Sequence, residues 1–204
     1  QGEMDKFLKK YLSGDISTEE FKLEFDRRTR KEWDLFGLKG MSGAMFLNML
    51  VKYAPDAQVL SNQLKLVLQV PPSSEQGRQM MANFISFIDN LIKSGQVTRR
   101  QLQSSRAPFF ISAWWHLQSL EQWPVFYISA RNALEKDGLY SPAQDLTDDY
   151  FTFRDVFLAL ASGLELTSWE LEQLCVWYEA NPRGPKIQIV TESTVEPEIL
   201  NDSE

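Results

Sequence analysis

A glycine-rich turn at residues 36–44 is the first feature that could do chemistry, because an apolar segment of helical period follows it directly. Glycines let backbone amides approach an anion, and the start of a helix adds unpaired N–H groups and a partial positive charge. We therefore expect a phosphate to bind at Gly40, Ser42 and Gly43, with the ammonium group of Lys39 beside it. The alternative is a turn whose glycines only allow two helices to pack closely.

The spacing of this turn matches no complete phosphate-binding motif. A Walker A loop requires Gly-x4-Gly-Lys-Ser/Thr, and a dinucleotide fingerprint requires Gly-x-Gly-x-x-Gly after a strand. The turn is similar in part to the loop of a helix-hairpin-helix element, written Leu-x-Gly-h-Gly-x-x-Ala with h apolar. Leu38 and Gly40 match that pattern, whereas Ser42 stands in place of its second glycine and Ala44 stands one position early.

Residues 108–131 form an aromatic segment that could hold a flat ring. Adjacent residues project about 100 degrees apart on a helix, so one indole of the pair Trp114 and Trp115 can enter the core while the other faces a cleft. Together with Tyr127 and the guanidinium group of Arg131, such a cleft would suit an unpaired base. The alternative is that these aromatic residues form the core.

Charge is distributed unevenly along the 204-residue chain, whose formal net charge is −7. Residues 41–131 have a surplus of four basic residues, whereas residues 132–180 have a surplus of eight acidic residues. The middle of the chain can therefore present a basic face although the whole chain is acidic. We expect three of its arginines to contact phosphates, with an ordinary solvated surface as the alternative: Arg99, Arg100 and Arg106.

The residue types exclude most familiar catalytic centres. The single cysteine, Cys175, excludes an internal disulfide and a cysteine-based zinc site, and the single histidine, His116, excludes a His-rich metal centre. We expect His116 to be a packing or hydrogen-bonded residue. The acidic residues between 145 and 155 could hold a divalent ion, but a helix N-terminus favours acidic residues without any metal. We predict no enzymatic activity, no cofactor and no metal site.

Two further segments have both a functional and a structural interpretation. The basic run at residues 27–31 could contact phosphates, but acidic residues on either side favour ion pairs along a solvated helix. Trp169 and Trp177 lie two turns apart on a predicted helix. Their face could dock an adjoining domain, or it could close the core.

The elements that position these residues are predicted to be helices from end to end. Ser17 and Glu20 have the spacing of a capping box, and Ser42 is a candidate cap for the helix after the glycine turn. Prolines suited to the first turn of a helix occur at Pro55, Pro108 and Pro124. The predicted fold class is all-α, an irregular bundle of about nine helices with a short C-terminal linker or tail.

We divide the chain into one domain with two flanking segments. Residues 1–3 are interpreted as the remnant of an engineered protease site, because Gln-Gly is how a common site of that kind ends. Residues 4–180 form a single helical domain, and residues 181–204 are an acidic linker or tail that leads to further domains. No apolar run reaches the roughly 20 residues of a membrane span. We therefore expect a cytoplasmic protein without membrane contact.

Three patches of the sequence together resemble a known family: Gly37 to Phe46, Trp123 to Tyr127 and Ser168 to Glu172. The family is that of the helical N-terminal regions of bacterial defence proteins, particularly modification-dependent restriction ATPases of the McrB type and related nuclease fusions. The resemblance covers most of residues 17–180. It implies that this module recognises DNA while a downstream motor or nuclease acts.

The leading prediction is therefore a DNA-recognition domain of a larger bacterial defence or restriction protein, without chemistry of its own. DNA and downstream domains of the same chain are the expected partners. The alternative is a protein-interaction or regulatory domain, whose aromatic faces dock a partner or an adjoining domain.

Overall fold

The computed structural model describes residues 2–30, 37–38 and 40–181. These residues form nine α-helices and one 3₁₀ helix without any strand, so the all-α prediction is confirmed. None of the helices in this part has the combined length and apolarity that a bilayer crossing requires. The elements are α1 (Gly2–Ser13), α2 (Thr18–Thr29), α3 (Ala44–Tyr53), α4 (Ala57–Leu68), α5 (Ser74–Lys93), η2 (Ser104–Arg106), α6 (Ala107–Gln118), α7 (Ile128–Lys136), α8 (Leu146–Gly163) and α9 (Ser168–Ala180).

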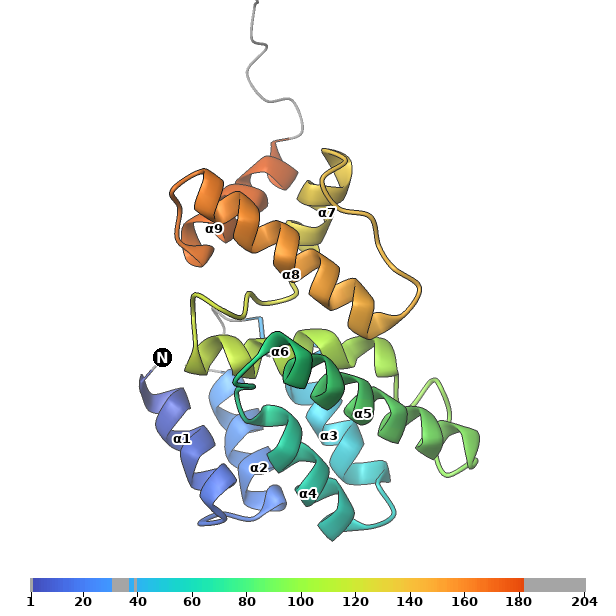
Figure 1. The fold of residues 1–204 in the computed structure, drawn as a ribbon. Helices are drawn as coiled ribbons and strands as arrows, with labels where there is room; N and C mark the ends of the chain where they lie inside the picture. Colours follow the sequence, from blue (N-terminus) through green and yellow to red (C-terminus); the bar gives the residue numbers. More distant parts are fainter. Residues whose placement is uncertain (1, 31–36, 39, 182–204) are drawn as a thin grey trace, which may run out of the picture.

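Helix α6 runs through the middle of the molecule (Figure 1). Helices α1 to α4 lie below it in this view, α5 packs against it, and α7, α8 and α9 lie above it. Ten of its twelve residues are buried. This burial follows from its sequence, because apolar residues occur on all of its faces rather than along one stripe.

The first tryptophan of α6 packs into the lower group of helices. The ring of Trp114 lies 5.4 Å from that of Phe21 and 5.1 Å from that of Phe25, both in α2. The indole has no exposed surface. A base cannot stack on a ring that solvent does not reach, so the prediction that Trp114 contacts a base is wrong.

The second tryptophan of α6 packs into a different part of the core. The ring of Trp115 lies 4.9 Å from that of Trp123 and 6.1 Å from that of Tyr150 in α8. Its indole N–H donates a hydrogen bond of 2.7 Å to the carbonyl of Val67 in α4. Trp115 is also fully buried, and its predicted role in base stacking is wrong as well. The side chains of Trp114 and Trp115 point in different directions, as expected for adjacent residues of a helix. Both directions lead into the core, because α6 is buried on both sides.

Helix starts follow the predicted capping signals in some places and depart from them in others. The capping box of Ser17 and Glu20 is present at the start of α2. Helix α3 begins after Gly43 and has no side-chain cap, so the predicted cap at Ser42 is wrong. Asp56, rather than Pro55, starts α4, because its carboxylate accepts hydrogen bonds from two backbone amides of the first turn.

Helix α7 begins at Ile128, four residues later than Pro124 suggests. Two hydrogen bonds hold the segment before it in a non-helical conformation. The ring nitrogen Nδ1 of His116 donates to the carbonyl of Trp123, and the hydroxyl of Tyr150 donates to the carbonyl of Pro124. Carbonyls bound by distant side chains are not available to a helix here, so packing overrides the preference of proline for a first turn.

Helix α1 was not among the predicted helices, although its sequence has an apolar period. Met4, Phe7, Leu8 and Tyr11 are its buried residues, and they recur at the spacing of one helical face. The helix begins at Gly2. Residues 2 and 3, interpreted as an engineered remnant, are therefore part of a folded helix.

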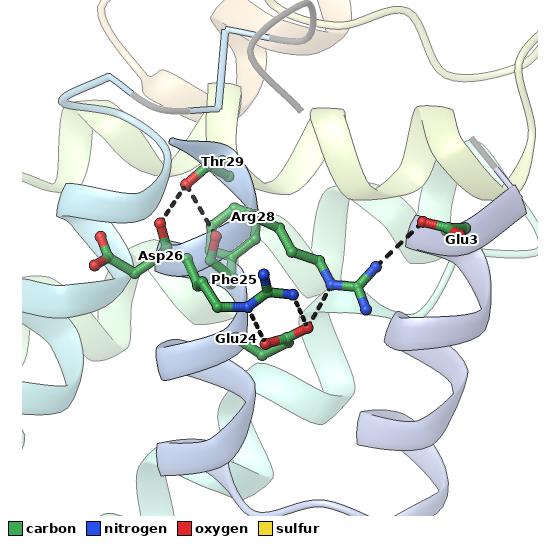
Figure 2. A network of polar contacts seen from close by, with 7 residues as sticks. Glu3, Glu24, Phe25, Asp26, Arg28 and Thr29 are labelled. Atoms are coloured by element: carbon green, nitrogen blue, oxygen red, sulfur yellow. Dashed lines mark hydrogen bonds and ion pairs between the residues drawn. The ribbon is translucent and has the colours of Figure 1, made fainter. Parts of the chain in front are cut away.

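The basic run at the end of α2 forms ion pairs, as the flanking acidic residues indicate. Figure 2 shows the guanidinium group of Arg28 between the carboxylates of Glu24 and Glu3. Arg30 pairs with Asp26 at 2.7 Å, four residues earlier on the chain. The described part of this run is thus a solvated helix surface with its charges paired; Lys31 lies outside the described residues.

A substitution at Gly77 tests how tightly α5 packs against Trp123 and against Phe151 of α8. A Cβ atom built there would lie 2.9 Å from the ring of Trp123 and 3.1 Å from that of Phe151. We expect Gly77→Ala to lower stability by about 1–3 kcal/mol, because overpacking outweighs the helix propensity of alanine. Gly163→Ala in α8 is the control, since its Cβ would meet nothing within 4 Å. Thermal unfolding of both variants measures this, and equal melting temperatures would contradict the close packing.

Candidate nucleic-acid interface

A cavity of about 470 Å³ lies where the glycine turn meets the start of α7. The turn and α7 are some ninety residues apart in the sequence. The described residues that line the cavity come from the turn, η2, α6 and the start of α7: Gly37, Gly40, Met41, Ser42, Ser105, Phe109, Phe126, Tyr127, Ile128, Ser129 and Arg131.

Aromatic rings form the apolar walls of this cavity. Phe109 and Tyr127 meet edge to face with 5.6 Å between their ring centroids. Gly37 lies against both rings with a positive φ of 64°, a conformation that favours glycine. The third ring, Phe126, lies beneath the guanidinium group of Arg131, 4.4 Å from its central carbon.

Arg131 is held in place by the buried carboxylate of Asp149 in the first turn of α8. The guanidinium group pairs with this carboxylate at 3.0 Å. Asp149 also accepts hydrogen bonds from the hydroxyl of Tyr140 and from the amide of Ala143. Burial and the hydrogen bond to Asp149 raise the pKa of Tyr140 to about 12, so this hydroxyl stays protonated and remains a donor. The position of Arg131 is therefore set before any ligand arrives.

Hydrogen bonds and close packing hold the described residues of the glycine turn. The amide of Ala44 donates a hydrogen bond of 2.7 Å to the carbonyl of Leu38. A Cβ atom on Gly43 would overlap that same carbonyl, so only glycine fits at this position. Arg106 fastens the turn to η2, because its guanidinium group donates to the carbonyl of Met41 at 3.1 Å.

The polar lining includes three serine hydroxyls, each of which can donate or accept a hydrogen bond. Ser42, Ser105 and Ser129 line the cavity, and their hydroxyls have no hydrogen-bond partner among the described residues. No side chain caps the N-terminus of α7, in contrast to Asp145 at α8 and Thr167 at α9. None of the described lining residues is acidic. Such a lining favours an anionic group.

The structure brings together four of the predicted binding residues. Gly40, Ser42, Tyr127 and Arg131 all line the cavity. The glycine turn and aromatic rings line the same cavity, but these rings are Phe109, Phe126 and Tyr127 and not the two tryptophans. Lys39, predicted to lie beside the phosphate, is outside the described residues.

The other predicted residues surround the cavity or support it. Gly43 and Arg106 shape the turn rather than line the cavity. Arg99 lines a neighbouring hollow of about 450 Å³, which Asp89 and Ser105 also line, so the two hollows share Ser105. Arg100 is exposed on the turn next to Arg99.

Several residues that line the cavity are not among the predicted binding residues, and Ser105, Phe109 and Ser129 are three of them. Phe109 and Ser129 lie within the aromatic segment that was singled out, but nothing in their spacing distinguishes them. Ser105 lies in a 3₁₀ turn that tertiary packing brings to the cavity. Only the spatial arrangement of the helices identifies them.

The other groups that could do chemistry have structural partners. The hydrogen bond from His116 to Trp123 confirms a hydrogen-bonded histidine, and burial lowers the pKa of its imidazole. Burial raises the pKa of the Cys175 thiol to about 11, so little thiolate exists at neutral pH. Asp145 caps α8, while Asp148 pairs with Arg78 at 2.7 Å.

Helix α9 presents a second surface of note. The side chains of Trp169 and Trp177 are each 51% exposed, so neither closes the core. Leu174 and Val176 are also exposed on this helix. An apolar hollow of about 230 Å³ lies between α7, α8 and α9, and Cys175 lies in its wall.

Comparison of the chain with models of protein families, with curated proteins and with solved structures finds no match.

The carboxyl group of Glu172 in α9 predicts how the stability of the chain depends on pH. Burial raises the pKa of its carboxyl group to about 7 from an ordinary value of 4.5. The folded chain therefore keeps this proton longer than the unfolded chain, and stability falls as pH rises from 4.5 through 7. Glu172→Gln should remove this loss and stabilise the chain by on the order of 1–2 kcal/mol above pH 7, with no gain below pH 4.5.

Chemical denaturation across this pH range measures the effect of Glu172→Gln. Glu135→Gln, at an exposed position of α7, is the control and should leave the pH dependence of stability unchanged. A gain for Glu172→Gln that is equally large at low and high pH would contradict the explanation by burial.

Proposed function

We propose that this chain is a nucleic-acid recognition domain that binds DNA through the cavity and the arginines around it. The observation that carries the proposal is the convergence of the glycine turn, Ser105 and Arg131 on one cavity whose described lining contains serine hydroxyls and no carboxylate. Uncapped helix starts and serine hydroxyls bind phosphate oxygens, and aromatic rings bind bases. Arg99 lines the neighbouring hollow that shares Ser105, and Arg100 is exposed next to it in the sequence, so both are proposed to contact the backbone of the nucleic acid.

Affinity for DNA should weaken steeply with salt, because phosphate contacts release counterions. We expect Arg99→Glu combined with Arg100→Glu to lower affinity by at least about tenfold at low salt and to reduce the salt slope by roughly 1 per lost contact. Fluorescence anisotropy with single-stranded and duplex oligonucleotides measures both quantities.

Lys9→Glu with Lys10→Glu is the matched control, since both lysines are exposed on α1 and the change in net charge is identical. The control should keep most of the wild-type affinity. Absence of binding by the wild-type chain even at low salt would refute DNA recognition, and an equal loss in the control would indicate a non-specific charge effect.

The assignment to a restriction protein extends this proposal. The resemblance to McrB-type N-terminal regions supports a role in bacterial defence, with a downstream motor or nuclease and a cytoplasmic location. These features stay predictions. The domain itself would select the DNA, and the chemistry would take place elsewhere.

The exposed face of α9 favours a second candidate function, the docking of a protein. Trp169 and Trp177 are half exposed beside an apolar hollow, and the surrounding segment 132–180 has a surplus of eight acidic residues. Apolar anchors within an acidic surface suit a basic amphipathic partner. This candidate and DNA recognition use different surfaces, so both can operate in one protein.

Replacing both exposed tryptophans shows whether their rings bind a partner or stabilise the core. We expect Trp169→Ser with Trp177→Ser to change the melting temperature by less than about 4 °C, because surface substitutions cost little. Binding of a helical peptide of leucine and lysine, measured by isothermal titration calorimetry, should be lost. A much larger drop in melting temperature would mean that the rings stabilise the core instead.

A further inference from the structure

The donors and the flat rings of the cavity belong to one site of limited size. We propose that this cavity binds a single nucleoside monophosphate unit, with its phosphate at the N-terminus of α7 and its base against the aromatic wall. The inference rests on the proposed function, because it names the ligand of the same site. Such a unit is available from two sources, a free nucleotide or a nucleotide within a strand.

The size of the cavity favours one unpaired unit. A volume of about 470 Å³ falls within the range of about 300–1,000 Å³ that is typical of small-molecule sites. A paired base inside a duplex presents only its edge, so its face cannot lie against a wall of the cavity. The ligand is therefore a nucleotide free of its partner strand.

The rings determine where the base lies. Phe109 and Tyr127 form an edge-to-face pair on one side, and the guanidinium group of Arg131, which covers the buried ring of Phe126, forms a flat shelf on the other. Every base has a π-face, so contacts of this kind tolerate any of the four bases. Binding should accordingly show little preference among bases.

Arg131 belongs to the base side rather than to the phosphate side. Its charge is already paired with Asp149 at 3.0 Å, so the guanidinium group adds little net attraction for an anion. Its Nε atom is buried and has no hydrogen-bond partner among the described residues. A planar group held in this way acts as a shelf for a flat ring.

The phosphate is bound by the serine hydroxyls and by the N-terminus of α7. Ser129 is the second residue of α7, where the backbone amides of the first turn have no side-chain cap. Ser42 and Ser105 supply hydroxyls from two other elements of the wall. Donors that converge from three elements without an acidic neighbour among the described lining residues match the oxygens of a phosphate monoester or diester.

Ser129→Asp tests the assignment without harming the fold. An acidic residue in the first turn of a helix is favourable for the helix, so α7 should remain stable. The new carboxylate would lie in the wall of the cavity and repel a phosphate. Ser74→Asp is the matched control, since Ser74 is an exposed first-turn residue of α5.

The first arm of the experiment titrates free nucleotides into the purified chain. We expect dAMP and dTMP to bind with affinities within about fivefold of each other, because stacking is tolerant of the base. Deoxyadenosine and inorganic phosphate should each bind at least tenfold more weakly than dAMP, since each lacks one half of the unit. Ser129→Asp should weaken dAMP binding at least tenfold, whereas Ser74→Asp should not change it.

The second arm titrates a single-stranded oligonucleotide and separates the two sources. A tenfold loss of strand affinity in Ser129→Asp, with no loss in Ser74→Asp, would assign the unit to a strand. If dAMP binds and the strand does not, the ligand of the cavity is a free nucleotide. This result would refute the proposal of DNA recognition but not the nucleotide site. Strand binding that neither Ser129→Asp nor excess dAMP reduces would overturn this inference while DNA recognition stands.

Discussion

The buried carboxylate of Asp149 is the interaction on which the upper part of the molecule depends. A charge removed from water is tolerated only when it is paired and hydrogen-bonded. Asp149 is 4% exposed and meets this requirement through Arg131, Tyr140 and the amide of Ala143. Its partners come from α7 and from the chain that follows it, whereas Asp149 belongs to α8. One carboxylate thereby fixes two helices against each other and gives the cavity a rigid wall.

This pairing also determines how the cavity can recognise a ligand. With the charge of Arg131 compensated, selection depends on shape, stacking and backbone or hydroxyl donors rather than on net positive charge. A chain with a formal net charge of −7 can bind an anion in this way, because the donors act over hydrogen-bond distances. The second wall consists of the described residues of the glycine turn, which the close packing of Gly43 on Leu38 and the hydrogen bond from Arg106 to Met41 hold in place. Both walls are therefore formed before binding, which lowers the cost of ordering them.

Much of the fold could be predicted from local signals, whereas little of the cavity could. The capping box of Ser17 and Glu20 identifies the start of α2, because the start of this helix is specified by its own residues. The start of α7 was misplaced because side chains of α6 and α8 bind the carbonyls before it. Trp114 and Trp115 are buried because apolar residues occur on all faces of α6, so the alternative that these aromatic residues form the core agrees with the sequence of this helix. Ser42, Ser105 and Arg131 line one cavity only because of the tertiary packing of the helices, and their spacing in the sequence does not predict this.

The central claim is that nucleic acid binds where the glycine turn meets α7. The most direct measurement is a titration of the isotope-labelled chain with a short single-stranded oligonucleotide, followed through the backbone amide signals in NMR spectra. We predict that the largest shifts cluster at Gly40, Ser42, Ser105 and Ser129, while the amides of α1 and α4 remain unchanged. Shifts confined to α9 around Trp169 and Trp177, or no shifts at all at low salt, would contradict the account.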